Sequence, residues 1–140
     1  MDSTKYEYNE LKIICPDDCG NAPKKYFLKE LSIAFAKNDL AFITDKITED
    51  FNWNIIGKKL IQGKESFVET LKQMQNKNVT ELHISNIITH GYDGSVNGTL
   101  ILENKRIYAF CNVYKFISPR NNSKIKECTS YVIESLYSKY

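Results

Sequence analysis

Residues Ile107–Ile117 constrain the fold more than any other stretch of the chain. Seven of these eleven residues are β-branched or aromatic, which predicts a long β-strand. Because side chains alternate between the two faces of a strand, this stretch presents two sets of side chains. One face carries Tyr108, Phe110, Asn112, Tyr114 and Phe116, and the other carries Ile107, Ala109, Cys111, Val113 and Lys115. Both faces are apolar enough to be covered, so we expect the strand to lie centrally in its sheet.

Asn112 is the exception on the aromatic face of this strand. A buried side-chain amide must form hydrogen bonds or cost about 1–3 kcal/mol of stability. Two interpretations stay open at this point. Asn112 is either a structural residue bonded to a neighbouring strand or loop, or a polar group that points into a ligand cavity.

The rest of the chain divides into an N-terminal tail and one domain. Residues 1–20 show no sustained periodicity, so we expect an irregular tail that is dispensable for folding, with residues 11–14 as the part able to dock on the body. A length of 140 residues then fits a single domain over residues 21–140.

Helices are expected first in this domain, and strands follow. Asn21 is a candidate N-cap and Pro23 suits a first helical turn, ahead of an apolar stripe that ends at Phe35. Asp39 can cap a second short helix, and a third helix is expected to open near Ile61. A strand is expected at residues 50–56, and period-two patterns predict four more at 79–90, 95–102, 106–117 and 124–135.

Helices followed by an antiparallel meander indicate the α+β class, with the helices on one face of the sheet. Three short helices cannot fully cover a strongly curved sheet of four or five strands. We therefore expect a pocket between the helices and the sheet.

Short motifs in this order resemble the NTF2-like fold, and more narrowly its SnoaL-like or ketosteroid-isomerase-like branch. Ala34–Leu40 (AFAKNDL) is similar to the break between helices 1 and 2 of that family, and Ile47–Trp53 (ITEDFNW) to the beginning of its first strand. Gln62–Glu65 (QGKE) is similar to the start of its third helix. The resemblance covers about residues 21–134.

The resemblance implies a cone-shaped fold in which a curved, mostly antiparallel sheet wraps three helices around a pocket open at one end. It also implies a homodimer through the outer face of the sheet. Family members include isomerases, cyclases, dehydratases, hydrolases and non-catalytic binding modules, so the fold does not fix the function.

Matching the steroid isomerase of this family residue by residue tests one activity. That enzyme uses a Tyr, an Asp base and a protonated Asp. The corresponding positions here are Leu31, a position near Ile55, and Asn112, so only the last keeps a polar side chain. The match also implies that the face with Phe110, Asn112 and Tyr114 looks inward.

The candidate site residues follow from the inward face and its neighbours. The expected ligand-binding residues are Trp53, Ile55, Phe110, Asn112, Tyr114, Cys128 and Ser130. Catalytic residues stay unknown, with Asn112 and His90 as candidates, because a histidine can titrate near neutral pH. The outward set expected at a dimer contact is Cys111, Val113, Tyr131 and Ile133.

Composition argues against several classes of partner. The net charge is +2, and only two of the 19 basic residues are Arg, so we expect neither a nucleic acid nor a membrane as partner. No apolar run is long enough to span a membrane and no signal peptide is evident, which predicts a cytoplasmic protein. Four cysteines and two histidines lack the spacing of a zinc site, so we expect free thiols, no metal and no cofactor.

Three functions remain open. The first is a non-catalytic module whose pocket binds a small, largely apolar molecule. The second is an enzyme that acts on a carbonyl-containing substrate, with Asn112 as oxyanion donor and His90 as acid or base. The third is a dimerisation and interaction module with a vestigial pocket.

Overall fold

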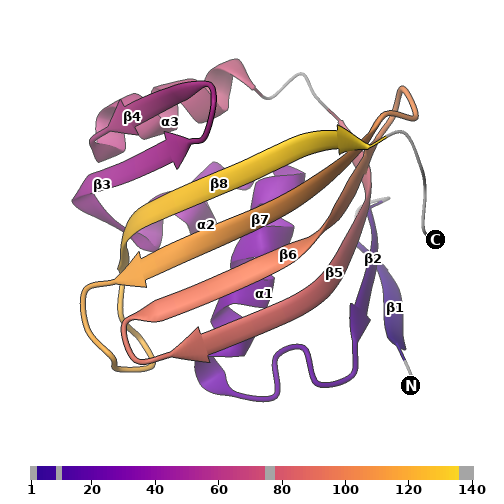
Figure 1. Cartoon of the computed structure of the whole chain (residues 1–140), viewed down its shortest axis with the longest axis horizontal. Helices are drawn as coiled ribbons and strands as arrows, with labels where there is room; N and C mark the ends of the chain where they lie inside the picture. Colours follow the sequence, from indigo (N-terminus) through magenta and orange to yellow (C-terminus); the bar gives the residue numbers. More distant parts are fainter. Residues whose placement is uncertain (1–2, 9–10, 75–77, 136–140) are drawn as a thin grey trace.

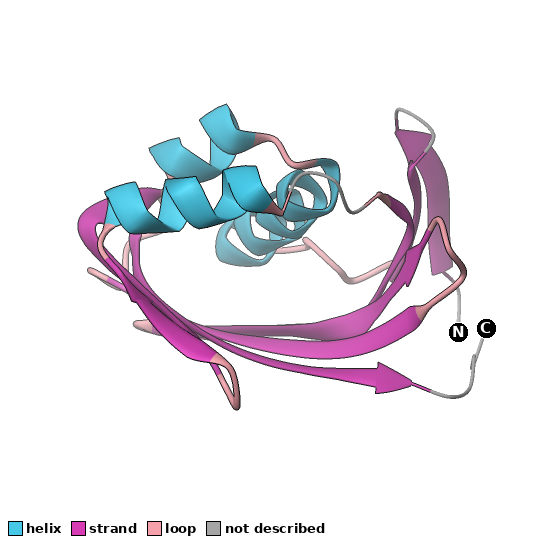
Figure 2. Ribbon diagram, turned by 90° about the horizontal axis from the view of Figure 1, so that it is seen from above, coloured by secondary structure: helices cyan, strands magenta, loops and turns pink. Residues whose placement is uncertain are grey.

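The computed structural model describes residues 3–8, 11–74 and 78–135 of the chain. In this part, one eight-stranded sheet curves around three helices, which lie on its concave side (Figures 1 and 2). The helices are α1 (Pro23–Lys37), α2 (Leu40–Asp45) and α3 (Lys64–Gln73). The strands are β1 (Ser3–Tyr8), β2 (Leu11–Pro16), β3 (Ile47–Ile55), β4 (Lys59–Gln62), β5 (Val79–His90), β6 (Asp93–Leu102), β7 (Ile107–Phe116) and β8 (Ile125–Ser135).

The sheet runs in the order β1-β2-β5-β6-β7-β8-β3-β4 and is mostly antiparallel. Two of its pairings are parallel, β2 with β5 and β3 with β8. The expected α+β class is confirmed. The long strand expected at residues 107–117 is β7, which lies between β6 and β8, as its two apolar faces predict.

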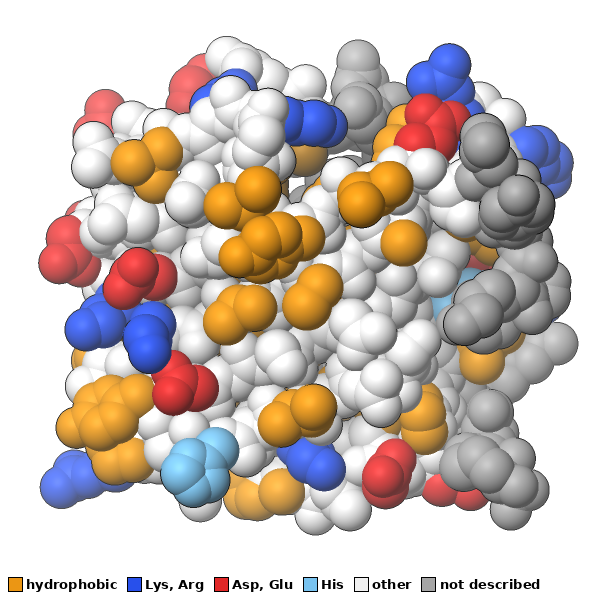
Figure 3. Space-filling model, viewed as in Figure 1, with side chains coloured by type: hydrophobic (Ala, Val, Ile, Leu, Met, Phe, Trp, Pro, Cys, Tyr) orange, Lys and Arg blue, Asp and Glu red, His pale blue; other side chains and the backbone are white. Residues whose placement is uncertain are grey.

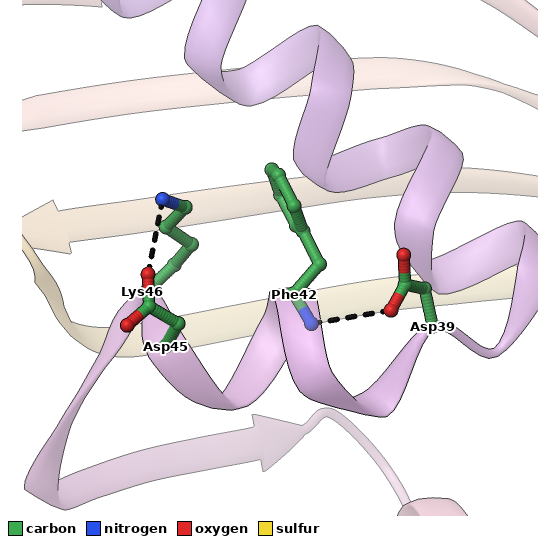
Figure 4. A network of polar contacts seen from close by, with 4 residues as sticks. All are labelled: Asp39, Phe42, Asp45 and Lys46. Carbon is green, nitrogen blue, oxygen red and sulfur yellow. Dashed lines mark hydrogen bonds and ion pairs between the residues drawn. The ribbon is translucent and has the colours of Figure 1, made fainter.

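Local sequence explains the helix boundaries. Pro23 begins α1 as expected, but the N-cap is Ala22 and makes no side-chain bond, so the prediction of Asn21 as the cap was wrong. Asn38 ends α1 in the left-handed conformation (φ 59°), and its backbone N–H donates to the carbonyls of Ala34 and Phe35. Asp39 then caps α2 by accepting a hydrogen bond from the Phe42 N–H at 3.2 Å (Figure 4).

The N-terminal region differs from the prediction of an irregular tail. Residues 3–8 and 11–16 are strands that pair with each other, and β2 also pairs in parallel with β5. Leu11, Ile13 and Cys15 are buried in the main core. Their alternation is a period-two signal, but it spans only one short strand.

The segment before α3 also differs from the prediction. Ile61 does not open a helix but lies in β4, where it pairs with Trp53 of β3 and is 6% exposed. The helix begins three residues later, after Gly63, whose φ of 90° turns the chain out of the sheet. The third helix is therefore shorter than expected, and the sheet gains an edge strand.

The core lies between the helices and the concave face of the sheet. Phe67 of α3 is fully buried, and its ring centroid lies 4.7 Å from that of Phe51 and 5.4 Å from that of Trp53. Phe35 of α1 joins this aromatic cluster at 6.1–6.2 Å from Phe67 and Trp53. These rings fill one part of the concave space and leave another part open.

None of the described helices is long and apolar enough to cross a membrane.

Candidate functional site

A cavity of about 420 Å³ lies between the helices and the sheet. Its volume falls within the range of about 300–1,000 Å³ that is usual for small-molecule sites. Its described lining residues are Ser32, Phe35, Ala36, Asn38, Trp53, Ile55, Lys58, Lys59, Thr70, Leu71, Gln73, Met74, Val79, Leu82, Leu100, Leu102, Tyr108, Phe110, Asn112, Cys128, Ser130 and Val132. Most of these side chains are aliphatic or aromatic, so the wall is largely apolar.

Six of the seven predicted ligand-binding residues lie on this cavity wall: Trp53, Ile55, Phe110, Asn112, Cys128 and Ser130. The seventh, Tyr114, is 1% exposed and is not among the lining residues. Its side chain lies in the packed core. That these residues bind a ligand stays a prediction.

Strand register brings the six residues together. Ser130 of β8 pairs with Asn112 of β7 on one side and with Ile55 of β3 on the other. Cys128, two residues earlier on the same face, pairs with Trp53. Three strands that are distant in sequence therefore present one row of side chains to the cavity.

A short chain of hydrogen bonds crosses this row. The Trp53 indole Nε1–H donates to Ser130 Oγ at 2.8 Å, and Ser130 Oγ donates to Asn112 Oδ1 at 2.6 Å. An indole N–H can only donate, so the Ser130 hydroxyl accepts from Trp53 and is left to donate to Asn112. The Oδ1 atom of Asn112 is thereby held toward Ser130, and the amide NH₂ is directed away from it.

Burial shifts the pKa values of two ionisable side chains, Cys128 and Tyr114, that lie beside these hydrogen bonds. It raises the pKa of the Cys128 thiol to about 12, with the Ser130 hydroxyl acting in the opposite direction. Burial also raises the pKa of Tyr114 well above its ordinary value, and the Asn112 amide opposes this shift. The Tyr114 hydroxyl makes no hydrogen bond of ordinary geometry with the described residues. Cys128 is thus a protonated, unreactive thiol at neutral pH.

Sequence comparison identifies no relative of the chain. No protein-family model matches the sequence, and no curated protein matches it.

Solved structures do resemble the fold. One is an NTF2-like protein of unknown function from Burkholderia xenovorans LB400. The match covers 83% of the present chain and 87% of the Burkholderia chain, with a TM-score of 0.67 and 16% identity. An LEH-like epoxide hydrolase from M. tuberculosis matches 79% of this chain and 82% of its own, with a TM-score of 0.63 and 18% identity. A SnoaL-like protein from Shewanella denitrificans OS-217, whose name suggests a polyketide cyclase, also resembles the fold. The match covers 75% of the present chain and 89% of the Shewanella chain, with a TM-score of 0.60 and 14% identity.

The chain has the NTF2-like fold. The predicted resemblance is confirmed at this level. At these identities the similarity concerns the fold alone, and the chemistry must come from the side chains of this chain.

In this NTF2-like fold, the candidate acid–base residue His90 lies away from the cavity. It is exposed at the end of β5, where it pairs with Asp93 across the turn to β6, and it is not among the lining residues. The structure therefore does not bring His90 and Asn112 together. The described lining residues include no carboxylate and no imidazole. Over the described residues, no group of three or more His, Cys, Asp or Glu side chains could hold a metal ion.

Sequence reasoning missed several cavity residues. Tyr108 and Val132 lie on the inward faces of β7 and β8, and strand parity could have found them. Met74 and Val79 flank the segment between α3 and β5, and nothing in the sequence marks them as lining residues. Lys58 and Lys59 also line the cavity, and their position there depends on the β3–β4 hairpin, whose edge strand the sequence analysis did not predict.

Proposed function

We propose that this NTF2-like protein binds a small, largely apolar molecule in the cavity and does not catalyse a reaction on it. We also infer that the curved sheet and the helices form a cone whose open end is the mouth of this cavity. The observation that carries the proposal is the lining itself: 14 of its 22 described residues are apolar or aromatic, and none of the 22 carries a carboxylate or an imidazole.

The competing enzymatic function has little support in this lining. Proton abstraction next to a carbonyl requires a base within hydrogen-bond reach of the proton, directly or through one water. The position that the steroid isomerase resemblance gives to the base is near Ile55, an apolar residue of the cavity wall. Asn112 alone can donate a hydrogen bond to a ligand but cannot abstract a proton.

Ligand binding can be measured through Trp53, the single tryptophan of the chain, because it lies on the cavity wall. We expect its fluorescence to change on titration with neutral naphthalene derivatives. The double variant Leu100→Phe with Val132→Phe narrows the cavity and should weaken binding at least tenfold, since the added ring atoms occupy space the ligand needs.

A matched control is available on exposed positions. Ile88 and Ile117 are 61% and 51% exposed, so Ile88→Phe with Ile117→Phe adds comparable rings away from the cavity and should leave binding unchanged. Equal affinity for both double variants, or no response to any probe of a size that fits, would contradict the proposal.

Asn112 is expected to contribute one polar contact to the ligand. Ser130 holds its carbonyl oxygen, so its NH₂ group is available as a donor to a ligand oxygen. Asn112→Leu should weaken binding of 2-acetylnaphthalene about five- to tenfold, the equivalent of one hydrogen bond of about 1 kcal/mol. Binding of 2-ethylnaphthalene, which lacks the acceptor, should change little. Equal losses for the two compounds would mean that Asn112 acts through the shape of the cavity alone.

We further infer a homodimer through the outer face of the sheet. The predicted residues Val113, Tyr131 and Ile133 are 41%, 48% and 72% exposed on β7 and β8, and Cys111 is half-buried between them. Figure 3 views the molecule from this side, where hydrophobic side chains gather over the middle of the sheet and charged side chains lie mainly nearer the edges. Apolar groups gathered in this way support a contact with a second protein surface.

A further inference from the structure

Two lysines at the cavity have no acidic partner in the described part of the chain. Lys58 lies in the turn that follows β3, where its N–H donates to the Ile55 carbonyl, and Lys59 is the first residue of β4. Both side chains are exposed, both line the cavity, and no ion pair is formed by either one with a described residue. Lys46, Lys64 and Lys115, by contrast, each contact a carboxylate.

The charged side chains at the cavity are therefore all of one sign. Lys58 and Lys59 are the only charged residues among its described lining residues, so the charge at the cavity is positive. In Figure 3 a gap opens near the upper edge of the molecule beside basic side chains. A site with two adjacent cations and no counter-ion attracts an anion and repels a cation.

We propose that the cavity takes an anionic amphiphile, with its apolar body inside and its charged head group at Lys58 and Lys59. The proposal rests on the proposed binding function and adds the chemical class of the ligand. The apolar wall, with Phe35, Leu82 and Leu100, accepts the body of such a molecule. A carboxylate placed among these residues would lose its hydration without full compensation. At the exposed lysines the carboxylate stays partly hydrated and is attracted by two ammonium groups of opposite charge.

The head group is best regarded as a compact anion. A lysine ammonium acts as a point charge and offers no planar fork for two-point recognition, unlike an arginine guanidinium. The two lysines therefore select for charge more than for head-group geometry. We expect a carboxylate and a sulfate ester on the same alkyl chain to bind comparably, with neutral and cationic analogues weaker in that order.

The test compares three ligands of equal chain length. Decanoate, 1-decanol and decyltrimethylammonium are titrated against the full chain, with Trp53 fluorescence and isothermal calorimetry as readouts. We expect decanoate to bind about three- to tenfold more tightly than decanol, because each exposed charge contributes modestly. Its advantage should shrink as salt is raised from 20 to 500 mM, since exposed charges are screened.

Variants separate the lysines from net charge. Lys58→Gln with Lys59→Gln should remove the advantage of decanoate and leave decanol affinity unchanged. Lys124→Gln with Lys126→Gln removes the same charge at two exposed lysines that do not line the cavity, and should leave both affinities unchanged. Lys58→Glu with Lys59→Glu should reverse the preference, so that decyltrimethylammonium binds more tightly than decanoate.

The outcomes distinguish this inference from the proposed function. If decanol and decanoate bind equally and neither lysine variant changes their ratio, the anionic ligand class is wrong while the binding function stands. If none of the three ligands binds and the neutral naphthalene probes also fail, the proposed function itself is wrong. Loss of the preference in the Lys124 and Lys126 control as well would show that net charge, not the cavity mouth, causes it.

Discussion

At the residue scale, Gly98 is the position where the sheet leaves least room for a side chain. It lies on β6 opposite a register shift of β5 between Ile84 and Asn86. An added Cβ would overlap the His83 carbonyl oxygen and would lie 3.0 Å from the His83 carbonyl carbon and 3.1 Å from Ile84 Cα. These are backbone atoms, which cannot move without breaking the ladder.

We therefore predict that Gly98→Ala lowers the free energy of unfolding by about 3 kcal/mol or more, at the upper end of overpacking effects. Gly94→Ala is the control, because its Cβ would meet the Leu28 side chain at 2.8 Å, and a side chain can rotate away. Urea denaturation of both variants gives the comparison. An equal or smaller loss for Gly98→Ala would mean that the strand pairing yields more easily than its register indicates.

Lys24 offers a pH-dependent prediction at the same scale. Its side chain is 6% exposed, and its ammonium donates to the Gly91 and Ser118 carbonyls at 2.6 and 3.2 Å and lies 4.3 Å from the centre of the Phe116 ring. Burial lowers its pKa in the folded state. A folded-state pKa below that of the unfolded chain means that the unfolded state binds more protons between the two values.

The contribution of Lys24 to stability should therefore rise as pH increases through its lowered pKa toward 10.5. Lys24→Met removes this contribution and leaves two carbonyls without a donor, so we expect a loss of about 1–3 kcal/mol at pH 7. The difference in unfolding free energy between wild type and variant should grow from pH 7 to pH 10.5. A constant or shrinking difference would contradict the pKa assignment.

Asn112 illustrates how far single residues could be interpreted from the sequence. Strand parity predicted its face, and both interpretations of its amide apply, because it bonds to Ser130 and also lines the cavity. The partner could not be predicted, since it depends on the register of β7 with β8. The place of His90 outside the cavity could not be predicted for a similar reason, because periodicity gives the face of a strand but not the point along the strand at which a cavity ends.

At the element scale, β2 carries more of the core than its sequence indicated. Ile13 has no exposed surface, whereas Ile14 on the opposite face of the same strand is only half-buried. We predict that Ile13→Ala costs about 2–5 kcal/mol, as for other fully buried aliphatic residues, and that Ile14→Ala costs less than half as much. Chemical denaturation measures both. Similar losses at the two positions would mean that β2 is not packed as a one-sided strand.

The same strand revises the expectation that the N-terminal tail is dispensable. Removing β2 would delete the buried side chains of Leu11, Ile13 and Cys15 from the core and expose the edge of β5. A parallel partner lies far away in the sequence, so no local hairpin signal accompanies such a strand. The meander from β5 to β8 was predicted well because its turns are local. β2 is short and includes a lysine, and its place in the sheet depends on pairing with the distant β5.

At the scale of the whole molecule, the outer sheet face leads to a prediction of oligomeric state. We expect light scattering at micromolar concentration to give twice the monomer mass of 16.2 kDa. Ile133→Asp with Val113→Asp should shift the protein to the monomer, because two charges would be buried without partners. Leu60→Asp, at a 55% exposed site on edge strand β4, is the control and should leave the mass unchanged. A wild-type mass near 16.2 kDa would refute the dimer.

The two parallel pairings have a consequence for the order of events during synthesis. β2 must find β5, and β3 must find β8, whose residues leave the ribosome much later. β2 and β3 therefore emerge with only a local hairpin partner, β1 or β4, whereas β5 to β8 can pair by successive hairpins as they appear. Until β5 and β8 are synthesised, one edge of β2 and one edge of β3 present unpaired backbone groups, and wrong contacts in the nascent chain are most favoured at these two edges.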